Sequence, residues 1–180
     1  MNKPSSAAQV KFSLDLLGPL VHLIGNWEGD KGNDTSPADP DRTKTAISKF
    51  REVTSFVPFG PVNNHDQVLY GLKYNTMAWR HGSPDAFHDD QGFWLWDAST
   101  SQVMKCFIVP RGIAVLAGGK CASDAKSFSV SAKVGDSVFG ISSNPYLDRE
   151  FKTLRYELKI NVSGDHFTYE SNTVLQIKGQ

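Results

Sequence analysis

The most apolar part of the chain lies near its middle, between residues 87 and 119. It contains three unbroken apolar runs, each about one strand long: Phe93–Trp96, Cys106–Val109 and Ile113–Ala117. A half-buried strand alternates apolar and polar residues, whereas these runs are apolar on both sides of the pleat. One side must face a core or cavity, and the other must meet a further nonpolar surface, such as a covering segment or a partner subunit. We interpret this segment as the middle of a β-barrel.

Segments with strand periodicity occur on both sides of this region. The clearest is 149–162, in which every second residue from Leu154 to Val162 is apolar. A period of two predicts a strand with one buried and one solvated face. The same reasoning predicts strands at residues 26–31, 43–57, 67–80, 127–134, 137–141 and 167–177. Residues 32–42 and 58–64 are rich in Gly, Pro and Asn, so we expect a loop and a rigid turn there.

Apolar positions between Val10 and Ile24 repeat at the spacing of one helix face. Gly18 and Pro19 interrupt the pattern, because Pro removes a helix hydrogen bond and clashes with the preceding turn. We therefore expect two short helical pieces, of which the second begins with Pro19 and stops at Gly25. Such a helix could plug one end of a barrel.

The element order defines the fold class. Short strands at regular spacing, joined by tight turns, indicate an antiparallel sandwich or barrel. Strands and helices do not alternate, and the sequence has no internal repeat. We therefore predict an all-β protein: a roughly ten-stranded antiparallel up-and-down β-barrel with a short N-terminal helix, in one domain that spans residues 1–180.

Charge and hydropathy exclude some classes of partner. Lys and Arg number 19, and so do Asp and Glu, which gives a formal net charge of +0. Nucleic acids and anionic membranes both select a basic surface, so we expect neither as the main partner. The N-terminus lacks the apolar core of a signal peptide, and no stretch is apolar enough to span a bilayer. We expect a cytoplasmic protein.

The two cysteines, Cys106 and Cys121, lack the spacing of a metal or redox motif. In a reducing cytosol they are expected to be small buried apolar residues. A disulfide between strands is the alternative.

Candidate chemistry is sparse, and the sequence contains none of the common catalytic motifs, so we predict no catalytic residue and no metal site. His88 precedes two carboxylates, Asp89 and Asp90. Such a group can be a metal site, a general base, a ligand-pocket histidine or a solvated turn. Arg111 follows a proline at a corner and either holds a carboxylate at a barrel mouth or is simply solvated. A barrel with apolar lining predicts a small hydrophobic ligand.

Several motifs, in order, resemble the nitrobindin family of heme-binding, fatty-acid-binding-protein-like β-barrels. Gly25-Asn26-Trp27-Glu28-Gly29-Asp30-Lys31-Gly32 is similar to the family's GxWxGxG signature, with the last glycine displaced by one place. The segments that resemble later family motifs are Leu72–Tyr74, Trp79, Phe87–Trp94, Val109–Gly112 with Gly118–Gly119, Arg149–Phe151 and Gly164–Tyr169. The resemblance covers nearly the whole chain.

This resemblance implies a ligand and a site. The ligand would be heme b, with nitric oxide or peroxynitrite chemistry at the iron, and any enzymatic activity would be that of a peroxynitrite isomerase. The implied cofactor-binding residues are Trp79, Phe87, His88 and Arg111. His88 stands at the place of the family's distal histidine, and Phe87 stands where the family often has Met.

One departure from the family affects the iron. The family's axial histidine lies on the final strand, but no histidine follows His166 before the chain ends at Gln180. Heme iron needs a proximal ligand to be held firmly. We therefore expect either a truncated form or a member that does not bind heme in the family's way. The barrel would also have an open edge between its first and last strands. The alternatives are a fatty-acid or lipid carrier without a metal, and a homodimer formed through exposed apolar strand faces.

Overall fold

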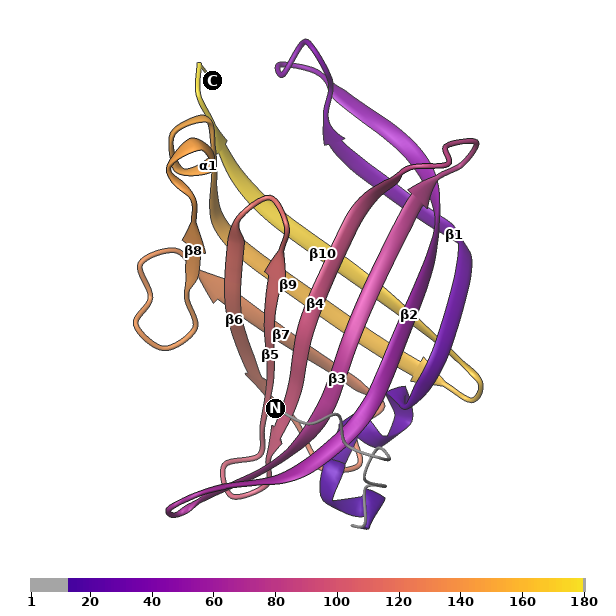
Figure 1. Ribbon diagram of the computed structural model, residues 1–180, viewed down its shortest axis with the longest axis vertical. Helices are drawn as coiled ribbons and strands as arrows, with labels where there is room; N and C mark the ends of the chain where they lie inside the picture. The colour runs from indigo at the N-terminus through magenta and orange to yellow at the C-terminus, as the bar shows by residue number, and fades with distance from the viewer. Residues whose placement is uncertain (1–12, 180) are drawn as a thin grey trace, which may run out of the picture.

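A computed structural model describes residues 13–179, and nearly all of that chain is β-structure (Figure 1). The strands are β1 (Gly25–Pro37), β2 (Thr45–Asn64), β3 (Gln67–Arg80), β4 (Ala86–Asp97), β5 (Gln102–Val109), β6 (Ile113–Lys120), β7 (Ser127–Lys133), β8 (Ile141–Ser143), β9 (Phe151–Ser163) and β10 (His166–Ile177). The helices are η1, a 3₁₀ segment (Leu14–Leu23), and α1 (Pro145–Glu150). All ten strands form one antiparallel sheet, which confirms the predicted fold class.

The sheet follows the chain almost without crossover. Each strand pairs with the next from β1 to β7, then β7 pairs with β9 and β9 with β10; the short β8 lies off this path against β6. The sheet curls so that the alternating apolar residues of every long strand face a common interior. Within the three central apolar runs, successive side chains alternate between the inner and outer faces of the sheet, as expected. Trp94 and Trp96 are buried inside, whereas Phe93 lies on the outer face and is 42% exposed.

The barrel does not close through backbone hydrogen bonds. Among residues 13–179, β1 and β10 each have a pairing partner on one side only, so the expected open edge is present. Side chains bridge the gap instead. At the end of the half-barrel near η1, the rings of Trp27 and Phe167 meet edge to face with centroids 5.0 Å apart. At the opposite end, beside α1, Arg42 Nη1 lies 3.3 Å from Glu150 Oε2. The result is a half-barrel with a side-chain seam.

The η1 segment closes the bottom of the half-barrel, as predicted (Figure 1). Leu17, Leu20 and Leu23 are fully buried. Gly18, with φ of 54°, allows the chain to reverse direction at the predicted break. A left-handed backbone is favourable there only for glycine. Val10, the first residue of the predicted helix, lies outside the described residues.

The predicted loop is shorter than expected, with residues 38–42 outside the strands, and the predicted rigid turn is wrong. Residues 32–42 were expected to be a loop, but β1 runs to Pro37 because its pairing with β2 resumes after a bulge between Gly29 and Gly32. Residues 58–64 were expected to be a turn, but they belong to β2, which pairs with β3 as far as Asn64. The register breaks between Phe59 and Val62, and an irregularity of this kind tolerates the proline that a regular ladder would exclude.

The region after β7 also differs from the prediction. Residues 137–141 were expected to be a strand but form mainly a loop, and only Ile141–Ser143 pairs with β6. The Asn144-Pro145 pair was expected only to end a strand. It also starts α1, because the Asn144 side chain accepts a hydrogen bond from Leu147 N at 2.9 Å. Asn at the N-cap and Pro at the first position are a strong helix start.

Candidate ligand-binding site

Strand alternation places a polar cluster in the middle of the interior. Tyr74 on β3, Asp90 on β4, Lys105 on β5 and Tyr156 on β9 are all buried. Asp90 Oδ2 accepts hydrogen bonds from Tyr74 Oη at 2.8 Å and from Lys105 Nζ at 3.1 Å. Lys105 Nζ also donates to Tyr156 Oη at 3.2 Å. Since β5 and β9 are separated by two strands in the sheet, this lysine links walls that are not neighbours.

The cluster is charged at its centre and neutral around it. Burial lowers the pKa of Lys105, but the oxygens of Tyr156 and Tyr74 and the Asp90 carboxylate outweigh it, so the pKa lies well above its ordinary value. Burial also raises the pKa of Tyr74 and Tyr156, which therefore remain neutral phenols. The ammonium lies 4.2 Å from the centroid of the Phe107 ring. Aromatic faces stabilise a desolvated cation. The Lys105–Asp90 ion pair therefore forms a buried, fixed floor inside the half-barrel.

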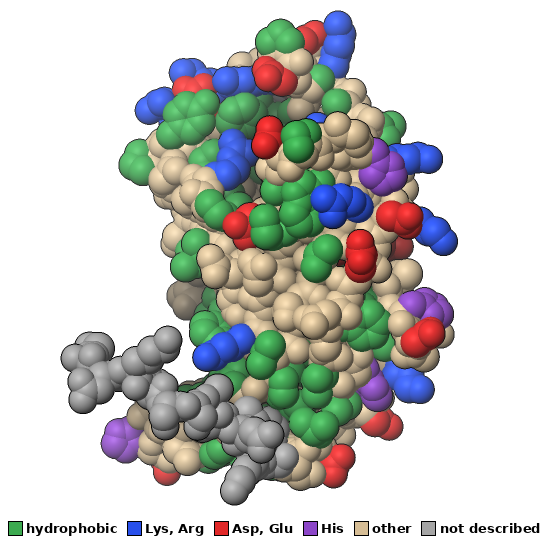
Figure 2. All heavy atoms as spheres, turned by 45° about the vertical axis from the view of Figure 1, so that its right-hand side comes forward, with side chains coloured by type: hydrophobic (Ala, Val, Ile, Leu, Met, Phe, Trp, Pro, Cys, Tyr) green, Lys and Arg blue, Asp and Glu red, His purple; other side chains and the backbone are tan. Residues whose placement is uncertain are grey.

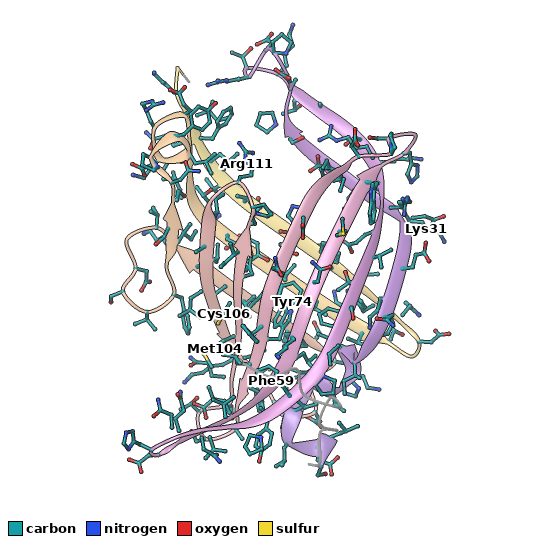
Figure 3. The ribbon with its side chains drawn as sticks, in the orientation of Figure 1. Lys31, Phe59, Tyr74, Met104, Cys106 and Arg111 are labelled. Carbon is teal, nitrogen blue, oxygen red and sulfur yellow. The ribbon has the colours of Figure 1, made fainter. Side chains whose placement is uncertain are left out.

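Above this floor, aromatic and basic side chains line the mouth, which we define as the end of the half-barrel opposite η1 (Figure 3). Phe50 and Phe87 meet edge to face, with ring centroids 5.7 Å apart. The Arg80 guanidinium lies 4.8 Å from the centre of the Phe87 ring. The Phe87 ring centre lies 6.4 Å from that of His88. The mouth thus offers flat apolar surfaces beside a histidine.

His88 is the histidine that faces this interior. Its Nε2 lies 3.8 Å from Asp90 Oδ1, which connects the mouth to the buried cluster, and its side chain is 41% exposed. Of the other described histidines, His22 lies in η1, His65 in the β2–β3 turn and His166 at the start of β10. His81 lies in the exposed β3–β4 turn, where its Nε2 is 3.0 Å from the backbone oxygen of Asp30. His88 is therefore the imidazole within reach of a ligand in the mouth, among residues 13–179.

Arginines stand on the rim between the β5–β6 turn and α1. The Arg42 and Arg111 guanidiniums lie 4.4 Å and 5.9 Å from the centre of the Phe151 ring. Arg42 also pairs with Glu150, which in addition bonds Arg149 and Lys178. Hydrogen bonds from Arg149 and Lys178, and from Arg42, lower the pKa of Glu150 to about 2. Arg111, the residue predicted to hold a carboxylate, makes no ion pair within the described part of the chain and stands at the mouth.

Trp79, the fourth predicted site residue, has a different position. Side chains of β3 alternate between the two faces, and Tyr74 and Ala78 point into the interior. Trp79 directly follows Ala78, so its side chain lies on the outer face. There its ring packs under the Arg51 guanidinium, 4.2 Å from the ring centre. The structure thus brings Phe87, His88 and Arg111 to the mouth and places Trp79 on the outside.

A second, partly buried acid lies on the seam side of the interior. Tyr169 Oη on β10 donates to Glu52 Oε2 on β2 at 2.7 Å. Burial raises the pKa of Glu52 above its ordinary 4.5, although the Tyr169 hydrogen bond acts in the other direction. A raised folded-state pKa means that the folded chain loses stability as pH rises above 4.5, because the unfolded chain ionises first.

We therefore predict that Glu52→Gln removes this loss. Glutamine keeps an acceptor for Tyr169 and carries no charge to bury. Urea unfolding below and well above pH 4.5 should show equal stability of the two proteins in acid and an advantage for Glu52→Gln at higher pH. Glu28→Gln, at an exposed position of β1, is the matched control and should not change the pH dependence. A parallel pH profile for Glu52→Gln and the wild type would contradict the assignment.

The donor groups at the mouth fit heme in three respects. An imidazole can ligate iron, aromatic rings can pack against the macrocycle, and a guanidinium can pair with a propionate. The facing strand β10 supplies hydroxyls such as Tyr169 and no imidazole among its described inner-wall residues. No group of three or more His, Cys, Asp or Glu side chains within residues 13–179 could hold a bare metal ion. Cys106 and Cys121 are free thiols.

Figure 2 shows acidic and basic side chains interspersed over the visible face. Within residues 13–179, no helix is both long and apolar enough to cross a membrane.

Comparisons with known proteins support the fold and identify the family. The crystal structure of Rv2717c from M. tuberculosis matches over 92% of this chain and 91% of that chain, with a TM-score of 0.61 and 15% identity, which shows the fold alone. No curated protein matches the sequence. The model of the THAP4-like, heme-binding beta-barrel domain matches residues 16–178, which confirms the resemblance found in the sequence. The chain belongs to this family of heme-binding β-barrel domains.

Proposed function

We propose that this barrel binds heme b at its mouth, with His88 as the residue nearest the iron. The observation that carries the proposal is the position of His88. It is the described imidazole on the inner wall, it is partly exposed at the open end, and the buried Asp90 lies behind it. Metal-bound histidines commonly have a carboxylate behind the ring, which fixes its orientation.

The neighbouring residues would contact the macrocycle and a propionate of the heme. Phe50 and Phe87 form an apolar wall, which suits a flat macrocycle. Arg111 has no ion-pair partner in the described chain and is free to pair with a propionate. When bound, heme would supply a redox-active iron for nitric oxide or peroxynitrite, and an isomerase activity would depend on that loading.

The interior does not favour the fatty-acid carrier. A carrier of this type needs a buried cation for the carboxylate of its ligand. Lys105 is buried, but Asp90 already neutralises it at 3.1 Å. An added carboxylate would have to displace a charge-assisted bond inside a dry core.

A cytoplasmic location stays a prediction.

A hemin titration followed by the Soret band tests the proposal. We expect a shifted Soret band with the wild type and an affinity at least ~10-fold lower with His88→Ala, since a ligating or contacting imidazole is lost. His166→Ala, in the exposed β9–β10 turn at the end of the half-barrel away from the mouth, is the matched control and should bind like the wild type. Circular dichroism should show both variants folded.

Two results would count against the proposal. A spectrum identical to that of free hemin would remove heme as the ligand. Equal affinities of His88→Ala and His166→Ala would show that hemin binds away from His88. Arg111→Ala separates the two ends of the site, because it should weaken hemin binding without changing the iron spectrum.

A further inference from the structure

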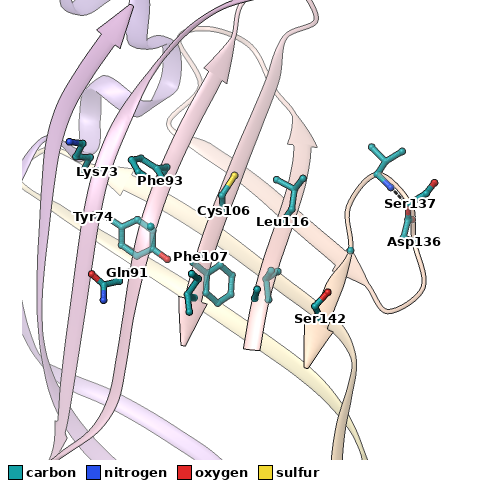
Figure 4. A pocket seen from close by; sticks show the side chains of 16 residues that line it. Lys73, Tyr74, Gln91, Phe93, Cys106, Phe107, Leu116, Asp136, Ser137 and Ser142 are labelled. Atoms are coloured by element: carbon teal, nitrogen blue, oxygen red, sulfur yellow. Dashed lines mark hydrogen bonds between the residues drawn. The ribbon is translucent and has the colours of Figure 1, made fainter. Parts of the chain in front are cut away.

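The outer face of the sheet carries a row of side chains at one register level. Lys73 on β3 pairs with Phe93 on β4, Phe93 with Cys106 on β5, and Cys106 with Leu116 on β6. The row continues into the β7–β8 loop, because Leu116 N donates to Gly140 O at 3.0 Å. All four side chains point outward, away from the interior (Figure 4).

This row crosses an apolar groove of about 820 Å³. Phe93 and Leu116 in the row are 42% and 37% exposed, and the adjacent Ile108 and Val138 are 60% and 62% exposed. Phe59 extends the surface beyond the groove, where its ring meets that of Phe93 at 5.5 Å. Contiguous exposure of large apolar side chains indicates an interaction surface. It is the nonpolar outer side of the central strands described in the sequence.

Opposite charges mark the two ends of the groove. Lys73 makes no hydrogen bond or ion pair with any of residues 13–179. At the other end, Asp136 Oδ1 accepts from the backbone N–H groups of Val138 and Phe139, at 2.9 Å and 3.4 Å, which orders the loop. The row therefore reads base, apolar, thiol, apolar, acid, with Cys106 at its midpoint (Figure 4).

We propose that the groove binds a second copy of this chain, related by a two-fold axis that passes beside Cys106. A half turn about this axis places Lys73 against Asp136 of the second copy and Phe93 against its Leu116. A two-fold interface requires a patch that is its own complement, and this row meets that requirement. An amphipathic anion would pair with Lys73 but would leave Asp136 opposite its apolar tail, so the charge pattern favours the second copy.

The geometry makes a specific prediction about the two cysteines. Cys106 of one copy lies beside Cys106 of the other, whereas Cys121 lies outside the groove. With copper–phenanthroline as oxidant, Cys121→Ser should give a covalent dimer rapidly, and Cys106→Ser should stay monomeric on denaturing gels. Equal crosslinking of the two variants would overturn the proposal.

Sedimentation velocity of hemin-free protein at rising concentration supplies the second arm. The wild type should shift from monomer to dimer, and Lys73→Glu should weaken the dimer at least ~10-fold, since it sets like charges opposite each other. Lys73→Arg keeps the charge and should dimerise. Leu116→Glu should remain monomeric, while Ile47→Glu, an exposed apolar position on β2 away from the groove, should behave like the wild type.

Three outcomes would overturn the inference. One is a monomer at all concentrations. Another is a dimer that resists Lys73→Glu and Leu116→Glu, because it would use a different face. The third is protection of Cys106 from alkylation in a monomeric sample, which indicates a small apolar occupant. None of these measurements uses heme, so they test the interface independently of the proposed heme site at the mouth.

Discussion

Replacing Lys105 by methionine is expected to lower the free energy of unfolding by about 3–5 kcal/mol, the usual result of removing one partner from a buried ion pair. Methionine fills most of the space of the lysine stem, so the loss reports on charge rather than volume. It leaves the Asp90 carboxylate inside the barrel with the Tyr74 hydroxyl as its one remaining hydrogen-bond donor among residues 13–179. It also removes the link to Tyr156 on β9. Urea unfolding at neutral pH measures the effect.

Matched variants make this test specific. Lys159→Met changes an exposed lysine on the outer face of β9 and should alter stability by no more than about 0.5 kcal/mol. The double variant Lys105→Met with Asp90→Asn should recover much of the loss, because Asn still accepts from Tyr74 and carries no charge. If Lys105→Met costs no more than Lys159→Met, the buried pair does not stabilise the interior.

The buried pair separates two parts of the barrel with different roles. Below it, η1 and the tryptophans of β4 form a close-packed apolar base. Above it, the wall carries half-exposed aromatic rings, a histidine and arginine side chains at an open end. A fixed floor keeps a ligand in the upper half, where His88 and Arg111 lie. The stability of the Lys105–Asp90 pair and the depth of the ligand site are therefore linked.

Local alternation in the sequence predicts much of this arrangement. The pattern of β5 shows it well, because Lys105 stands between Val103 and Phe107 at two buried positions. The same parity rule separates Asp89 from Asp90 and puts Asp90 inside. A lysine at an inward-facing position of an apolar strand indicates a buried charge. The sequence prediction did not include Lys105.

Other features depend on tertiary structure. The contact between Lys105 and Tyr156 forms only because the sheet curls until β5 and β9 face each other, and no local pattern encodes that curvature. The outward position of Trp79 follows from the strand period, but an aromatic near a family motif looked like pocket lining. Residues 58–64 read as a turn because local Pro and Gly signals are strong, yet pairing with β3 overrides them.

The second large effect is expected at the base of the barrel. We predict that Gly18→Ala lowers the free energy of unfolding by roughly 2–4 kcal/mol, from an unfavourable left-handed backbone and an overpacked contact. An added Cβ would lie within 2.5 Å of Trp96, whose indole is itself held in the core and cannot move aside. Thermal or urea unfolding measures the change.

A control separates the two causes of this loss. Gly135 also has a positive φ, of 80°, but its added Cβ would meet nothing within 4 Å. Gly135→Ala should therefore cost only the backbone part, about 1–2 kcal/mol. In a Trp96→Leu background, Gly18→Ala should lose its packing penalty and approach the cost of Gly135→Ala. If Gly18→Ala and Gly135→Ala are equally destabilising in the wild-type background, then η1 does not seal the barrel against Trp96. In that case the packing of η1 against β4 tolerates an added methyl group at residue 18, and the contact with Trp96 does not limit the structure of the base.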